Sequence, residues 1–129
     1  MKLMAKRILI VEDDTRLSDL LKETLTALDE IEVKTFTSGD ATMSLLLEGK
    51  FRPDLAILDY QLEGSQITGE ELCVILRTSF PDMPIIMLSG RMEAQDISDV
   101  LRACGSTFIH KPYSPRDLLE RIEKLLKIS

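Results

Sequence analysis

Residues 7–14 read Arg7-Ile-Leu-Ile-Val-Glu-Asp-Asp14, an apolar run that ends in three consecutive acidic residues. Continuous runs of branched aliphatic side chains suit a strand that is buried on both faces, as in a parallel sheet. The stretch therefore predicts a buried parallel strand with carboxylates at its carboxyl end.

Four further apolar runs follow, and amphipathic segments with helical spacing separate them. This alternation is typical of repeated βα units around a parallel sheet. We expect five strands, over residues 7–11, 32–36, 55–58, 85–88 and 107–109, each followed by a helix. The second run alone alternates apolar and polar residues, which predicts an edge strand. For the first helix we expect a buried stripe made of Leu17, Leu20, Leu21 and Leu28.

The composition fits one globular domain: 129 residues, of which 44% are hydrophobic and 29% are charged. We expect a single domain over residues 1–129, with residues 1–5 a disordered or cloning-derived start. A chain of this length needs no disulfide or structural metal to fold. Cys73 and Cys104, which lack CxxC spacing, are therefore expected to be reduced packing residues.

Charge and hydropathy exclude two classes of direct partner. The net charge of −6 would repel a nucleic-acid backbone. The apolar runs are far shorter than the ~20 residues that cross a bilayer, and no charged leader precedes a cleavable apolar stretch. We expect a cytoplasmic protein without membrane insertion.

Polar side chains close four of the five apolar runs. Ligand sites in such folds lie beyond the carboxyl ends of the strands, so these groups are expected to converge. They are Glu12-Asp13-Asp14, Asp59, Ser89-Gly90 and His110-Lys111-Pro112. Clustered carboxylates repel one another, and Mg²⁺ with oxygen ligands would relieve that repulsion. With the metal and Lys111 holding a phosphoryl group, Asp59 could attack phosphorus while Ser89 binds another oxygen.

Single residues also have structural readings that stay open. Asp14 suits the amino end of a helix, with Thr15 as a competing N-cap, and Lys111 alone could be a solvated surface residue.

Together these motifs resemble the receiver domain of response regulators, the phosphoacceptor of two-component signalling, over nearly the whole chain. The matching stretches are residues 7–14, 53–59, 83–90 and 110–112. The resemblance implies a flavodoxin-like doubly wound α/β fold with five helices and strand order 2-1-3-4-5. It also implies a phosphohistidine donor on a sensor kinase or phosphotransfer protein.

The same resemblance assigns roles residue by residue. Asp59 would be the phosphoacceptor, and Glu12 and Asp13 would be the acidic pair, with Asp13 directly on Mg²⁺. Gln61 would lend its backbone carbonyl to the metal. The phosphoryl group would be bound by Ser89 and Lys111, with Ser89 and Phe108 as the switch pair. The state would be transmitted through the surface of the fourth helix, fifth strand and fifth helix, which is also a possible homodimer interface.

The chain departs from the family pattern after the acceptor. Residues 60–68 lack the usual proline and reach Gly69 about two residues late, so we expect a longer and more mobile loop. Gly64 and Gly69 have P-loop spacing, but Glu70 and Glu71 would repel a nucleotide phosphate.

Three further side chains near the expected site receive weaker assignments. Gln61 and Arg91 are candidate tuners of the lifetime of the acyl phosphate, or ordinary surface residues. His110 is expected to be only a neighbour of Lys111.

Two other functions remain open at this point. An aspartyl-phosphate hydrolase typically has a second acid two residues after the nucleophile, where this chain has Gln61. A binding-only receiver would keep the fold without being phosphorylated, and the full set of expected site residues argues against it. The output partner cannot be read from the sequence.

Overall fold

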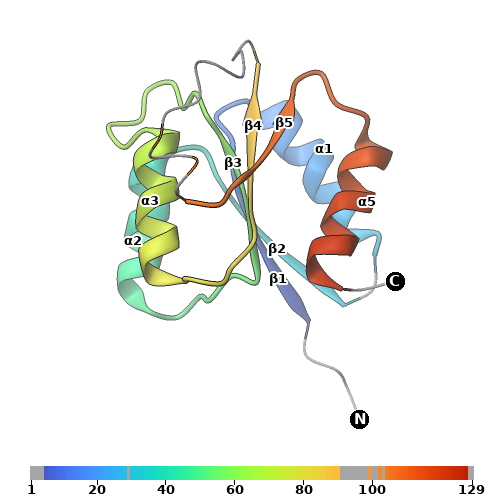
Figure 1. Cartoon of the computed structure of the whole chain (residues 1–129), viewed down its shortest axis with the longest axis horizontal. Helices are drawn as coiled ribbons and strands as arrows, with labels where there is room; N and C mark the ends of the chain where they lie inside the picture. Colours follow the sequence, from blue (N-terminus) through green and yellow to red (C-terminus); the bar gives the residue numbers. More distant parts are fainter. Residues whose placement is uncertain (1–4, 29, 91–98, 100–101, 103, 128–129) are drawn as a thin grey trace.

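The computed structural model of the chain describes residues 5–28, 30–90, 99, 102 and 104–127. It is a parallel five-stranded sheet in the order β2-β1-β3-β4-β5, with helices on both faces (Figure 1). The strands are β1 (Lys6–Val11), β2 (Ile31–Phe36), β3 (Leu55–Asp59), β4 (Ile85–Ser89) and β5 (Thr107–His110). The described helices are α1 (Thr15–Thr26), α2 (Gly39–Glu48), α3 (Gly69–Ser79) and α5 (Pro115–Leu126).

The expected strand order and the edge position of β2 are confirmed, with β5 at the opposite edge. Each strand is one residue longer than its apolar run. In β3, β4 and β5 the added residue is the polar one at the carboxyl end, because its backbone still belongs to the sheet. Of the expected fourth helix only Asp99, Arg102 and Cys104 are described, so this helix lies mostly outside the described residues.

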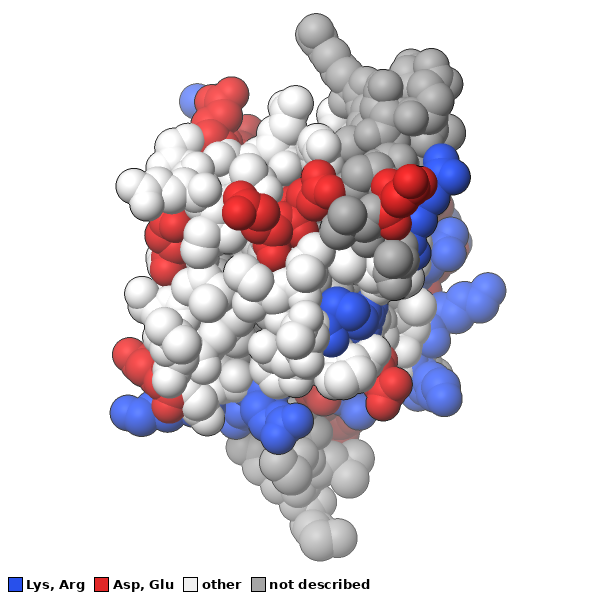
Figure 2. All heavy atoms as spheres, turned by 60° about the vertical axis from the view of Figure 1, so that its left-hand side comes forward, with Lys and Arg blue, Asp and Glu red and all other residues white. Residues whose placement is uncertain are grey.

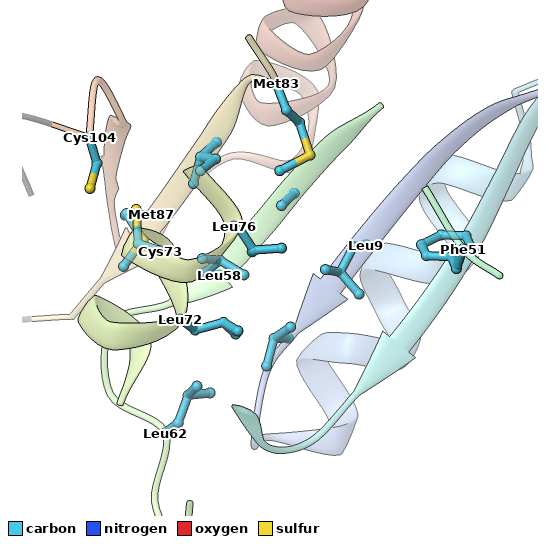
Figure 3. Packing of buried hydrophobic residues seen from close by; sticks show 13 residues of the cluster. Leu9, Phe51, Leu58, Leu62, Leu72, Cys73, Leu76, Met83, Met87 and Cys104 are labelled. Carbon is cyan, nitrogen blue, oxygen red and sulfur yellow. The ribbon is translucent and has the colours of Figure 1, made fainter. Parts of the chain in front are cut away.

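Alternate residues of each central strand face two separate cores. In β1, Ile8 and Ile10 pack toward α1 and α5, whereas Leu9 and Val11 pack toward α2 and α3. Figure 3 shows the second of these clusters, in which the apolar side chains of α3 project toward the strands. Burial on both faces explains why the central strands carry unbroken apolar runs.

The expected buried stripe of α1 is partly wrong. Leu21 and Leu25 are buried, but Leu20 is 50% exposed and Leu28 lies beyond the end of the helix. Leu21 and Leu25 are four residues apart and share one face, from which Leu20 is turned by about 100°.

Cys73 and Cys104 are buried free thiols, as expected. Burial is the main cause that raises the pKa of Cys73 to about 11, so its unreactive thiol form dominates at neutral pH. Within the described residues, no helix is long and apolar enough to cross a membrane.

The start of α3 is pressed against the end of β3. A Cβ at Gly69 would lie 2.3 Å from the carbonyl oxygen of Asp59, so the close approach requires glycine. Thr68 caps α3, and the carboxylate of Glu71 accepts a hydrogen bond from the Thr68 backbone N–H at 3.1 Å. Glu71 thus serves as a capping residue of the helix.

Candidate functional site

The carboxyl ends of four neighbouring strands bring the expected polar groups to one edge of the sheet. Glu12 follows β1 and stays in the ladder, since its backbone N–H donates to Phe36 at 2.9 Å. Asp59 ends β3 and Ser89 ends β4. Lys111 follows β5, and its backbone N–H donates to the Ser89 carbonyl at 2.7 Å. Backbone pairing with neighbouring strands thus fixes the Cα position of each of these residues.

Lys111 bridges two buried carboxylates. Its Nζ donates to Glu12 Oε1 and to Asp59 Oδ2, both at 3.0 Å. The side chains of Glu12 and Asp59 are only 1% and 7% exposed. Burial alone would lower the pKa of Lys111, but its hydrogen bonds to Asp59 and Glu12 outweigh that effect and raise it. Lys111 therefore carries its positive charge in the site, which overturns its reading as an isolated surface lysine.

One carboxylate oxygen of Glu12 is buried without a hydrogen-bond partner in the structure. Its Oε2 is the one buried side-chain oxygen or nitrogen of the described residues without a hydrogen bond in the structure. Burial is the main cause that raises the pKa of Glu12 to about 8, and a hydrogen bond with Asp59 adds to it. An unsatisfied buried carboxylate oxygen is costly unless a cation or a proton meets it.

The donor set of this cluster fits a hard divalent cation. Glu12, Asp13 and Asp59 each offer an oxygen, and the three oxygens lie within 4.8 Å of one another. Oxygen ligands from carboxylates are those that Mg²⁺ prefers. With the orphaned Glu12 Oε2, the cluster can hold such an ion.

An open cleft of about 390 Å³ lies over the cluster. The residues around it are Glu12, Asp13, Asp14, Leu17, Asp59, Gln61, Glu63, Gly90 and Lys111. Asp14 is also the N-cap of α1, accepting from the Arg16 N–H at 3.0 Å. The capping interpretation of Asp14 is thus confirmed, and Thr15 is the first helical residue.

The remaining expected residues lie around the cleft rather than in it. Ser89 is 2% exposed and does not line the cleft. Phe108 is half-buried on β5 beside the core cluster of α3. His110 is exposed and lines a different hollow, between β5 and α5. Arg91 lies outside the described residues.

Residues 60–68 make defined contacts with the core and with the site. Leu62 is 8% exposed and belongs to the core. The Gln61 N–H donates to Asp59 Oδ1 at 3.1 Å, and the Glu63 N–H donates to Asp13 Oδ2 at 3.0 Å. The sequence reasoning missed Glu63 because main-chain donors leave no side-chain signal.

Comparison with known proteins identifies the class. The family model of the response regulator receiver domain matches residues 8–123, and the chain therefore belongs to this family. It is a two-component signalling domain with a flavodoxin-like fold.

Individual relatives agree with this assignment. The chain is 32% identical over 127 residues to the DNA-binding response regulator MtrA of Mycobacterium tuberculosis, covering 98% of this chain and 53% of MtrA. It is 37% identical over 127 residues to the phosphate regulon transcriptional regulatory protein PhoB of Rhizobium meliloti, covering 96% of this chain and 53% of PhoB. The chain spans about half the length of these curated relatives.

A solved structure matches along nearly its whole length. The CheY-like receiver domain protein of Methanospirillum hungatei has a TM-score of 0.83 and 31% identity, covering 95% of this chain and 94% of that chain.

Proposed function

We propose that this chain is a phosphorylation-switched receiver that accepts a phosphoryl group on Asp59. The observation that carries the proposal is the environment of this carboxylate. Lys111 Nζ donates to Oδ2 at 3.0 Å and the Gln61 N–H donates to Oδ1 at 3.1 Å, at the floor of an open cleft. The Asp59 carboxylate is held in place by the Lys111 ammonium and lines a cleft that is open to solvent. Such a nucleophile is well placed to attack an incoming phosphoryl group.

Magnesium is the proposed cofactor of the reaction. Asp13, Asp59 and the backbone carbonyl of Gln61 would hold it, and Glu12 would support it. When bound, such an ion neutralises negative charge on the phosphoryl oxygens and on the carboxylates.

The donor is a phosphohistidine of a sensor kinase or phosphotransfer protein. An Asp59 oxygen forms the new O–P bond as the P–N bond breaks, and the bonding electron pair leaves with the imidazole nitrogen. Lys111 then transfers the hydrogen bond that it donates to Asp59 Oδ2 to a phosphoryl oxygen. The modification is removed by water, whose oxygen bonds to phosphorus as the P–O bond to Asp59 breaks, which releases inorganic phosphate and restores the carboxylate. The chain thus catalyses its own modification and no other turnover.

The switch begins at Ser89. A phosphoryl group on Asp59 adds about −1.5 to −2 charge and three acceptor oxygens, and the Ser89 hydroxyl turns toward one of them. Phe108, whose strand pairs with β4 in register, then moves inward. We propose that this changes the surface of β5, α5 and the segment before β5, where the output partner or a second copy binds.

The relatives suggest the kind of output that this chain controls. MtrA is described as DNA-binding, and we propose that this chain controls an effector of that kind in the cytoplasm without touching nucleic acid itself.

Intact-mass measurement with acetyl phosphate tests the acceptor. We expect one phosphoryl group per chain in the presence of Mg²⁺, none after chelation, and none in Asp59→Asn. The matched control is Asp14→Asn, which lies in the same cleft and keeps a good N-cap. It should label normally. Equal labelling of Asp59→Asn would move the acceptor elsewhere, absence of labelling would favour a binding-only module, and phosphate release from many substrates would favour a hydrolase.

A further inference from the structure

We propose that residues 61–67 form a strap that holds the Asp13 carboxylate ready for the cation, with Ser65 and Asp40 as its positioning residues. The proposal rests on the magnesium site proposed above. It assigns a role to the loop that departs from the family pattern and to two side chains outside the cleft.

One end of the strap reaches the site through main-chain donors. The Glu63 N–H donates to Asp13 Oδ2 at 3.0 Å, which leaves Asp13 Oδ1 for other partners. Two residues earlier, the Gln61 N–H donates to Asp59 Oδ1 at 3.1 Å. The strap thus holds one oxygen of each of two acidic side chains with neutral donors.

The other end is fastened to the first turn of α2. Ser65 Oγ accepts from the Gly39 N–H at 2.9 Å and donates to the Ile67 carbonyl at 2.6 Å. One residue further along, the Gln66 N–H donates to Asp40 Oδ2 at 2.9 Å. Asp40 also lies in the first helical turn, where a negative charge is stabilised.

Packing fixes the strap between these two ends. Leu62 is 8% exposed among the core residues. Gly64, with φ +77°, makes the turn that follows it. A Cβ at Gly39 would lie 2.9 Å from Ile67, so the strap and α2 are in close contact. The Glu63 amide therefore has a defined position that depends on its neighbours.

Asp13 needs such support because its surroundings are acidic. Glu12, Asp14, Asp59 and Glu63 line the same cleft as Asp13, and Figure 2 shows acidic side chains across the upper part of one face of the molecule. A partly exposed carboxylate without a fixed partner samples several rotamers, and some of these point away from Glu12 and Asp59. A neutral amide that holds one oxygen reduces this freedom, so less entropy is lost when the cation binds.

The coupling must act in both directions. If fastening the strap improves cation binding, cation binding must tighten the strap by the same factor. The amides of Gly39 and Gln66 report on the fastening because they donate to Ser65 and Asp40. They should therefore respond to Mg²⁺ although they contact none of the proposed ligands.

The test measures Mg²⁺ affinity by calorimetry and the two amides by NMR. Loosening one end of the strap should weaken Mg²⁺ binding about fivefold or more in Ser65→Ala, which loses two hydrogen bonds, and about fivefold in Asp40→Ala, which loses one. Ser65→Thr keeps the hydroxyl and Asp40→Asn keeps an acceptor oxygen, so both should bind nearly as wild type. Thr78→Ala, which removes a hydroxyl that donates to the Val74 carbonyl of its own helix at 2.9 Å, is the control and should be unchanged.

The outcomes separate the strap from the site. The strap is supported if the wild type binds Mg²⁺, Ser65→Ala binds it more weakly, and the NMR response of the Gly39 amide to Mg²⁺ is lost in Ser65→Ala. Unchanged affinity in a folded Ser65→Ala and Asp40→Ala overturns the strap and leaves the proposed site intact. No Mg²⁺ binding by the wild type, together with no labelling of Asp59, overturns the proposed function itself.

Discussion

Replacing Glu12 with glutamine should remove most of the pH dependence of stability of the metal-free protein between pH 5 and 8. Glu12 is 1% exposed and its Oε2 has no hydrogen-bond partner in the structure. Its pKa is raised by burial to about 8, from 4.5 in an exposed chain. The folded state therefore keeps a proton on Glu12 that the unfolded state loses first, so the contribution of Glu12 to stability is greatest below pH 4.5 and is lost as the pH rises through 8.

The expected size follows from one proton. Between the two pKa values, the free energy of unfolding falls by about 1.4 kcal/mol per pH unit. Lys111 in the site and the buried Cys73 thiol in the core both have a raised pKa, so they change charge at higher pH. A loss of roughly 2 kcal/mol between about pH 5.5 and about pH 7.5 should therefore come from Glu12.

Urea unfolding followed by circular dichroism in the presence of a chelator measures this slope. Glu12→Gln mimics the protonated side chain and should give a nearly flat profile. Glu63→Gln, which removes an exposed carboxylate of the same cleft, should keep the wild-type slope. At pH 8, added Mg²⁺ should raise the free energy of unfolding of the wild type, and it should raise that of Glu12→Gln by less. An identical slope in Glu12→Gln and wild type would refute the assignment of the proton to Glu12.

Two further predictions concern the metal and the switch. Asp13→Ala should weaken Mg²⁺ binding at least tenfold, since it removes a charged ligand, whereas Lys111→Ala removes a competing cation and should not weaken it. Calorimetric titration compares the two, and equal losses would contradict the assigned roles. Ser89→Ala should still be phosphorylated but should show smaller amide shifts over α5 when beryllofluoride is added. Wild-type shifts confined to the loops around Asp59 would rule out the route through Phe108.

The sequence could predict the sheet and the charged centre of the site because both depend on simple rules. Buried parallel strands need unbroken apolar runs, and the carboxyl ends of neighbouring strands meet at one edge. The positions of Glu12, Asp59 and Lys111 follow from these rules. In the structure, Lys111 Nζ lies within hydrogen-bonding distance of both carboxylates. Their roles in phosphoryl transfer remain predictions.

The loop after β3 could not be predicted in the same way. Ser65 and Gly39 are 26 residues apart, and no periodicity relates a loop hydroxyl to the first amide of a distant helix. The absence of the usual proline suggested mobility, but burial of Leu62 and contacts with α2 compete with that local signal. Leu20 shows the same limit, because apolar character alone does not say which neighbouring residue faces the core.

The strand order explains why the loop after β3 is suited to link the site with α2. The chain passes from β2 at one edge, through α2, to β3 on the far side of β1. This reversal leaves the crevice of the site between the ends of β1 and β3. The loop leaving β3 borders that crevice and leads to α3, which packs on the same face of the sheet as α2 (Figure 1). A longer loop at this place can therefore contact Asp13 and the first turn of α2 at once, whereas the end of β4 lies one strand further from β1.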